Sequence, residues 1–228
     1  MTLILGIETS TTVCSVALTN DGATVAVEKL FLEKSHSSLL TIAISDLLRH
    51  AGVQKKDLSA VAVSKGPGSY TGLRIGVSTA KGICYALDKP LISVSTLKAM
   101  AHEVNKFNVN SALLCPMIDA RRMEVYTALF DSDLQELKPT SALILDEASF
   151  AETIAQNQVF FFGNGAGKFH PLIETQTNAR FVQGISPSAE SVAQLAYQSF
   201  HQGEFEDVAY FEPYYLKDFI ATKPKKRL

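Results

Sequence analysis

Short apolar runs separated by polar turns fill the first thirty residues. The runs at 3–8 and 14–18 are joined by four hydroxyl residues at 9–12, and a third run at 23–32 follows the turn at 20–22. Because Asn, Asp and Gly between apolar runs favour tight turns, this pattern predicts a three-stranded meander.

Helical periodicity then alternates with short buried runs up to about residue 104. A glycine-rich segment interrupts the pattern after the first of these buried runs. The expected elements are a helix at 35–51 ended by Gly52, a strand at 60–64, a helix up to about residue 87, a strand at 91–94 and a helix at 96–104.

The second half of the chain repeats the opening. At one constant offset the matched features are Glu8 with Asp119, residues 17–18 with 128–129, and the turn at Asn20 with the turn at Asp131. At a shorter offset, a strand at 159–162 enters the turn 163–165 much as 61–63 enters 66–68. The sequence therefore predicts an α/β protein of two similar halves, 1–104 and 105–228, each reading strand, strand, strand, helix, strand, helix. This arrangement resembles the duplicated ribonuclease-H-like fold of actin, sugar kinases and chaperone ATPases, which bind nucleotide between their halves.

Composition narrows the class of protein. With 46% hydrophobic and 19% charged residues, the chain can bury a core, and a net charge of -2 is unlike the basic excess of a dedicated nucleic-acid binder. The three cysteines, Cys14, Cys84 and Cys115, are far apart in apolar runs, so we expect buried reduced thiols rather than disulfides or a zinc site. The first residues lack the features of a signal peptide or membrane span, so the cytoplasm is the expected compartment, with no membrane partner.

Acidic residues end the first strand of each half. Glu8 and Ser10 stand where the nucleotide-binding relatives of this fold carry an Asp and a Gly that hold phosphate and magnesium. Two interpretations stay open, a relic phosphate turn and a plain polar hairpin turn. In the second half Asp119 is followed by two arginines, which predicts an ion pair between an arginine and Asp119 or a partner. The candidate nucleotide cleft comprises Glu8, Ser10, Asp119, Gly163 and Gly165.

The run from Gly66 to Gly76 is the most unusual stretch. It matches neither the P-loop nor the dinucleotide-binding pattern. The expected helix contains Gly72, Gly76 and Gly82. Each glycine destabilises the helix by about 1 kcal/mol relative to Ala, so a closely packed neighbour must offset that cost. We predict that the helix at 35–51 and the helix after Gly68 form an interface with another protein. Ordinary burial within the subunit is the alternative. The predicted interface residues are His36, Leu39, Leu40, Leu47, Tyr70, Leu73, Arg74, Val77 and Ala80.

With this run, the sequence resembles the TsaB (YeaZ) family of tRNA threonylcarbamoyladenosine biosynthesis proteins over nearly its whole length. The matching segments are 7–10, 14–17, 119–126, 163–165 and the string Gly66-Pro67-Gly68-Ser69-Tyr70-Thr71-Gly72-Leu73-Arg74-Ile75-Gly76. The resemblance implies a non-catalytic subunit that joins a larger catalytic paralogue, TsaD, and a P-loop ATPase, TsaE, with tRNA bound through the complex. It also implies a homodimer when the chain is alone, no required cofactor, and ATP or ADP only within the complex.

The resemblance further implies that no metal is bound. TsaD-type enzymes carry a His-x-x-x-His pair where this sequence has Thr96 and Met100, which are poor metal ligands. The competing hypothesis is a nucleotide-binding ATPase or kinase that uses Glu8, Asp119 and the turn at 163–165. The basic run at 223–227 is either a solvated tail or a tRNA contact.

Overall fold

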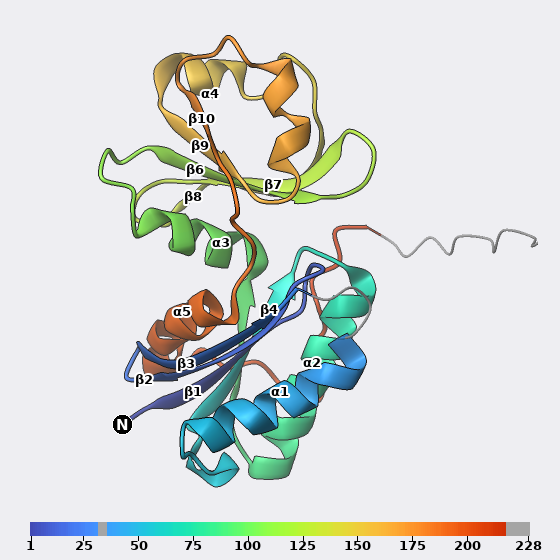
Figure 1. Ribbon diagram of the computed structural model, residues 1–228, viewed down its shortest axis with the longest axis vertical. Coiled ribbons are helices and arrows are strands. Elements are labelled where there is room, and N and C mark those ends of the chain that lie inside the picture. The colour runs from blue at the N-terminus through green and yellow to red at the C-terminus, as the bar shows by residue number, and fades with distance from the viewer. Residues whose placement is uncertain (32–35, 218–228) are drawn as a thin grey trace, which may run out of the picture.

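The computed structural model describes residues 1–31 and 36–217, and the side chain of His36 also lies outside the description. The first lobe is built on a five-stranded sheet in the order β3-β2-β1-β4-β5. Its strands are β1 (Leu3–Glu8), β2 (Cys14–Asn20), β3 (Ala23–Leu30), β4 (Ala60–Gly66) and β5 (Leu91–Ser95). Strand β1 pairs antiparallel with β2 and parallel with β4. Helices α1 (His36–His50) and α2 (Tyr70–Leu87) cover one face of this sheet, with a 3-10 turn, η1 (Lys55–Asp57), between α1 and β4 (Figure 1).

The second lobe repeats this topology. Its strands are β6 (Leu113–Asp119), β7 (Glu124–Phe130), β8 (Glu136–Ile144), β9 (Val159–Phe162) and β10 (Ala179–Val182). They are ordered β10-β9-β6-β7-β8, which is the first sheet's order read from the other edge. Strand β6 again pairs antiparallel with the next strand and parallel with β9. The predicted duplication and the ribonuclease-H-like class of fold are therefore confirmed.

The second half departs from the predicted element order after β9. Where a helix was expected, two 3-10 turns follow, η2 (Ala166–Lys168) and η3 (His170–Leu172), and the one preceding helix, α4 (Ala151–Gln156), is short. Gly167 and Pro171 explain this outcome, because glycine disfavours a helix and proline removes a backbone donor.

The two lobes exchange helices. Helix α3 (Thr96–Asn105) follows the first sheet in the chain, yet its apolar residues Leu97 and Met100 pack with Leu114 and Phe162 of the second sheet. Helix α5 (Ala189–Gln202) lies against the first sheet instead, on the face opposite α1 and α2 (Figure 1). The prediction that residues 105–228 form one half is thus wrong at α5. This helix belongs to the second half in sequence, but it covers an apolar face of the first sheet.

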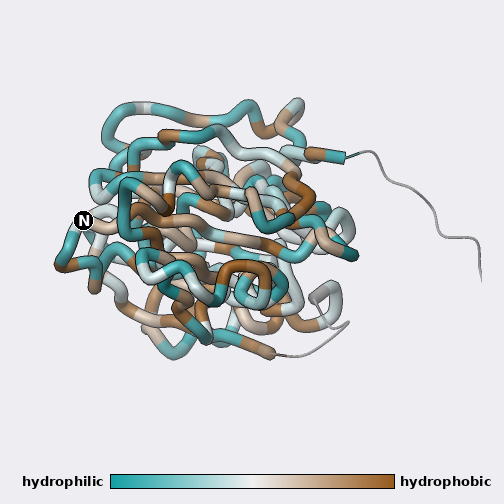
Figure 2. Tube along the Cα trace, turned by 90° about the horizontal axis from the view of Figure 1, so that it is seen from above, coloured by the Kyte–Doolittle hydropathy of each residue, from teal (hydrophilic) through white to brown (hydrophobic). Residues whose placement is uncertain are grey.

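The interior is apolar and its cysteines are reduced. Brown segments of the hydropathy-coloured trace run through the middle of the molecule and teal ones through its outer loops (Figure 2). Cys14, Cys84 and Cys115 are free and buried, as predicted. Burial raises the pKa of the Cys84 thiol to about 11 and that of Cys115 to about 12. Among the described helices, none combines the length and the hydropathy needed to cross a bilayer.

After α5 the chain returns along the first lobe as a C-terminal strap, which we define as residues 204–217. The Glu206 N–H donates to the Leu91 carbonyl (2.8 Å), and the Tyr214 N–H donates to the Lys65 carbonyl (2.7 Å). The ammonium of Lys81, on α2, donates to the carbonyls of Ala209 and Phe211, both at 3.0 Å. The strap is therefore held to β5, to α2 and to the end of β4. The basic run at 223–227 lies outside the described residues.

Candidate functional site

The turn between β1 and β2 packs directly on the start of α2. The Thr9 hydroxyl donates to the Gly72 carbonyl (2.8 Å), and the Ser69 N–H donates to the Ser10 carbonyl (2.6 Å). A Cβ at Gly72 would lie 2.1 Å from the Thr9 carbonyl oxygen, and one at Gly68 would lie 2.4 Å from that of Ser10. These glycines are therefore required by an intramolecular contact, so at Gly72 the closely packed neighbour predicted from the helix glycines is the subunit's own turn and not another protein.

Gly76 lies on the inner face of α2 and Gly82 on its outer face. A Cβ at Gly76 would lie 2.3 Å from the Thr9 hydroxyl oxygen, so this glycine serves the same contact as Gly72. Gly82 has nothing within 4 Å of the equivalent position and is exposed. Only the outer part of the glycine-rich helix thus remains accessible to another molecule.

Glu8 is buried beneath this turn. Its Oε1 accepts the Ser10 N–H (2.5 Å), whereas Oε2 has no hydrogen-bond partner among the described residues. Burial raises the pKa of Glu8, although Ser10, Ser64 and the charge of Lys29 act in the opposite direction. The hydroxyls of Ser10 and Ser64 lie near the carboxyl, but neither makes a hydrogen bond of good geometry in the described chain. Glu8 thus anchors its own turn and presents no carboxylate at the surface.

The corresponding turn of the second lobe is held by a lysine. The ammonium of Lys168, on η2, lies 2.5 Å from Oδ1 of Asp119, which also accepts the Arg121 N–H at 2.6 Å. Burial opposes ionisation, but the hydrogen bonds from Lys168 and Arg121 outweigh it and lower the pKa of Asp119. The predicted pairing of an arginine with Asp119 is wrong, because Lys168 supplies the charge and Arg121 only its backbone N–H. The alternative, an arginine that pairs with a partner, stays a prediction. No local pattern points to Lys168, which lies 49 positions away in the chain.

Asn164 and Gly163 complete that turn. The Asn164 side chain accepts the Asp119 N–H (2.9 Å), and Gly163, at a φ of 99°, would place a Cβ 2.4 Å from the Met117 carbonyl oxygen. The turn 163–165 and Asp119, both among the candidate cleft residues, therefore lie in contact. A hollow of about 790 Å³ lies beside it, with Asn164, His170 and Phe181 in its walls.

The candidate cleft residues Glu8, Ser10 and Asp119 do not fit a magnesium-bound triphosphate held between the two turns. Glu8 and Ser10 are buried, and the Ser10 N–H is directed to the Glu8 carboxyl. On the other side, Lys168 occupies the Asp119 carboxyl, and neither acid nor Ser10 lines the 790 Å³ hollow. The five candidate cleft residues thus belong to two separate turns. Glu8 and Ser10 are buried in the first, whereas in the second Asp119 is exposed but paired with Lys168, and Gly163 lines the hollow.

The predicted interface residues divide by burial. Leu73 and Val77 are only 1% and 4% exposed and pack in the subunit's own core. The prediction that these residues contact a partner is therefore wrong, because α1 and α2 use them to cover the sheet and each other. The interface residues that are buried in this way are Leu40, Leu47, Leu73, Val77 and Ala80. Leu39 and Tyr70 are half-buried, and Arg74 is exposed.

Two apolar residues that the sequence prediction missed lie on the outer surface of these helices. Ile42 on α1 is 55% exposed and Tyr85 on α2 is 85% exposed. Ile42 had one available signal, its position on the helix side away from the other leucines. Nothing in the pattern distinguished Tyr85.

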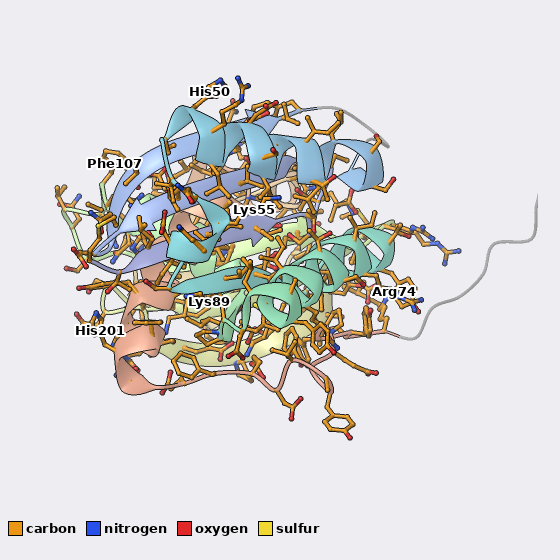
Figure 3. All side chains as sticks on the ribbon, turned by 90° about the horizontal axis from the view of Figure 1, so that it is seen from below. His50, Lys55, Arg74, Lys89, Phe107 and His201 are labelled. Carbon is orange, nitrogen blue, oxygen red and sulfur yellow. The ribbon has the colours of Figure 1, made fainter. Side chains whose placement is uncertain are left out.

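A shallow groove of about 460 Å³ opens between the start of α1 and the outer face of α2. Its walls include Ser37, Thr71, Arg74 and Ser78. Arg74 points away from the body of the lobe (Figure 3), and its guanidinium donates to the Tyr70 hydroxyl at 3.1 Å. The Tyr70 ring in turn lies 4.8 Å, centroid to centroid, from Tyr215 of the strap. The strap therefore supports one edge of this groove.

The histidines do not converge. His50 ends α1 and His201 lies near the end of α5, at different sides of the molecule (Figure 3). Across residues 1–31 and 36–217, no group of three His, Cys, Asp or Glu side chains has a geometry that could hold a metal ion.

Comparison with known proteins gives one family model and full-length relatives named TsaB. Residues 31–225 match the family model described as "TsaD: tRNA N6-adenosine threonylcarbamoyltransferase". The chain is 33% identical over 226 residues to the tRNA threonylcarbamoyladenosine biosynthesis protein TsaB of Escherichia coli K12, covering 96% of each chain. It is 32% identical to the Bacillus subtilis TsaB, covering 94% of this chain and 93% of that one.

Solved structures agree with this similarity. YeaZ from Pseudomonas aeruginosa superposes with a TM-score of 0.83 at 26% identity, over 95% of this chain and all of that one. The activator of 2-hydroxyisocaproyl-CoA dehydratase from Clostridium difficile, solved with ADPNP, gives a TM-score of 0.53 at 12% identity, over 90% and 98% of the two chains. At that identity the second likeness concerns the fold alone.

Proposed function

Since the chain belongs to the TsaB family of tRNA threonylcarbamoyladenosine biosynthesis proteins, we propose that it is the non-catalytic partner of a TsaD-type threonylcarbamoyltransferase. The observation that carries this proposal is that the chain's own groups occupy both acids of the turns: Glu8 is buried beneath the turn that α2 packs on, and the exposed Asp119 is paired with Lys168. In the nucleotide-binding proteins that this fold resembles, the equivalent turns hold phosphate, whereas in this chain they make contacts within the subunit. A role in holding another protein needs no chemistry at these turns.

The outer face of α1 and α2 is the proposed contact surface. Ile42 and Tyr85 place apolar area on it, and the exposed small residues Ser78, Gly82 and Ala86 of α2 would allow close approach of another backbone. Exposed apolar side chains among small residues favour a helix-on-helix interface. Without its paralogue, the chain would pair through the same surface with a second copy of itself. A TsaE-type P-loop ATPase and tRNA then join through the complex, and any ATP or ADP is bound there rather than by this chain alone.

Charge placed at the exposed apolar positions tests this surface. Ile42→Asp and Tyr85→Asp should each weaken binding to the TsaD-type paralogue from the same cell by at least tenfold, because an unpaired carboxylate would be buried on association. Val109→Asp is the matched control, since Val109 is 91% exposed in the loop before β6. Calorimetric titration measures the affinity, and circular dichroism checks folding. By contrast, Leu73→Asp should unfold the subunit, since its side chain is 1% exposed.

The outcome that sinks the assignment is specific. Unchanged affinity in both Ile42→Asp and Tyr85→Asp, with both variants folded, would place the interface elsewhere. No association between the wild-type chain and the paralogue would remove the partner role itself.

The hollow beside Asn164 favours a second candidate function, a nucleotide-binding ATPase or kinase. Its volume of about 790 Å³ is within the range of small-molecule sites. Calorimetry of the isolated chain with ATP and magnesium separates the two functions. Micromolar binding with turnover would favour the enzyme, and absence of both would favour the partner role.

A further inference from the structure

Two consecutive arginines form the tip of the hairpin between β6 and β7. Arg121 and Arg122 are both exposed. Among the described residues neither guanidinium makes an ion pair or a hydrogen bond with the rest of the chain. Two adjacent guanidinium groups on an exposed turn are a concentrated source of positive charge.

The backbone at this tip is unfavourable for arginine. Arg121 has a φ of 74° and Arg122 a φ of 49°. Hairpin turns with two successive positive φ angles strongly prefer Asn, Asp or Gly, because a longer side chain in this region costs about 1 kcal/mol or more per residue. A hairpin shaped for stability alone would carry Asn-Gly here. The two arginines therefore occupy this turn against its own residue preference.

The acids of the hairpin are already neutralised by lysines from elsewhere in the chain. Asp119 pairs with Lys168, and Glu124 pairs with Lys217 at the end of the strap. The two carboxylates nearest the tip in sequence are thus occupied, and the charge of both arginines is left for an external anion.

We propose that Arg121 and Arg122 bind the phosphate backbone of tRNA in the assembled complex. The inference rests on the proposed function, which brings tRNA to this protein. RNA fits the tip better than a free nucleotide does, because the arginines are exposed on a turn and line neither the 460 Å³ groove nor the 790 Å³ hollow. Guanidinium groups bind phosphates bidentately, and contacts to the backbone position RNA without reading its sequence.

The test measures tRNA affinity of the chain bound to its TsaD-type paralogue. An unmodified tRNA transcript that the complex accepts is titrated in filter-binding assays at several potassium chloride concentrations. Each lost phosphate contact should lower affinity about fivefold near 0.15 M salt and reduce the salt slope by about one. The double variant Arg121→Gln, Arg122→Gln should therefore bind tRNA about 25-fold more weakly with its paralogue affinity unchanged.

Three further variants separate charge from structure. Arg121→Asn with Arg122→Gly suits the turn, so it should raise the thermal midpoint while weakening tRNA binding as the glutamine pair does. Arg121→Lys with Arg122→Lys keeps the charge and should retain most of the salt slope. Arg180→Gln is the matched control, because Arg180 is an exposed arginine on β10 of the same lobe. Its tRNA affinity should equal that of the wild type.

The contrary outcomes are distinguishable. A formed complex in which the double glutamine variant binds tRNA like the wild type would overturn the arginine assignment alone. Loss of paralogue binding in that variant would assign the tip to a protein contact, and loss of ATP binding would assign it to a nucleotide. A wild-type chain that forms no complex would overturn the proposed function and this inference with it.

Discussion

Gly72→Ala adds one methyl group where α2 meets the turn after β1. The new Cβ would lie 2.1 Å from the Thr9 carbonyl oxygen, and the neighbour in the way is backbone rather than a flexible side chain. Relief requires the turn and the helix to separate. That movement breaks the hydrogen bond from the Thr9 hydroxyl to the Gly72 carbonyl and strains the one from the Ser69 N–H to Ser10.

The expected loss of stability is about 3 kcal/mol. Overpacking costs about 1–3 kcal/mol, and the upper end applies here because the obstructing atom is backbone; the one broken hydrogen bond costs about 1 kcal/mol more. Alanine recovers about 1 kcal/mol through its higher helix propensity. For a chain of this size, about 3 kcal/mol corresponds to a fall of roughly 6–12 °C in the thermal midpoint.

Gly82→Ala is the matched control in the same helix. Nothing lies within 4 Å of its Cβ position, so the propensity gain of about 1 kcal/mol should appear as a slightly higher midpoint. Differential scanning calorimetry of the two variants and the wild type measures both shifts. If Gly72→Ala matches or exceeds the wild type in stability, the packing explanation of the glycine-rich run is refuted.

Three other predictions concern the same framework. Burial raises the pKa of Glu8 above 4.5, so the folded state keeps this proton while the unfolded state loses it, and the stability contributed by Glu8 falls as the pH rises above 4.5. Glu8→Gln should remove this loss, and its thermal midpoint should exceed that of the wild type increasingly from acidic to neutral pH. Lys81→Met deletes both hydrogen bonds to the strap, so limited proteolysis followed by mass spectrometry should show faster cleavage within 204–217. A fragment of residues 1–104 should show no cooperative thermal transition by circular dichroism, and a cooperative transition in it would contradict the helix exchange between the lobes.

Much of the fold was predictable because its signals are local. Apolar runs and the turn at 20–22 mark element boundaries to within a few residues, and the structure starts β3 at Ala23, directly after that turn. The repeat was visible because Glu8 and Asp119 end equivalent strands. What the local pattern does not contain is which sheet a helix covers, so the exchange of α3 and α5 was missed.

The candidate site was harder for the same physical reason. The sequence pattern of an apolar helix residue is the same whether the residue faces its own sheet or a partner protein. Leu73 was therefore predicted at an interface although it is buried in the core. Gly72 and Gly76 correctly indicated a closely packed neighbour, although not that it is the turn at Thr9, whereas Gly82 has no such neighbour. Lys168 and Lys217 act through ion pairs that join distant parts of the chain, and no spacing in the sequence reveals such pairs.

The exchange of helices makes the lobes structurally dependent on each other. A Cβ at Gly6, in the middle of β1, would lie 2.3 Å from the Ala189 carbonyl oxygen, so α5 approaches the first sheet at backbone distance. Removing α5 would expose the face formed by Ile4 and its buried neighbours, and removing the second sheet would expose the apolar side of α3. Apolar surface of this extent destabilises a fragment by more than the few kcal/mol that a small domain has in reserve. The boundary near residue 104 therefore separates two sheets, but it does not separate two units that fold alone.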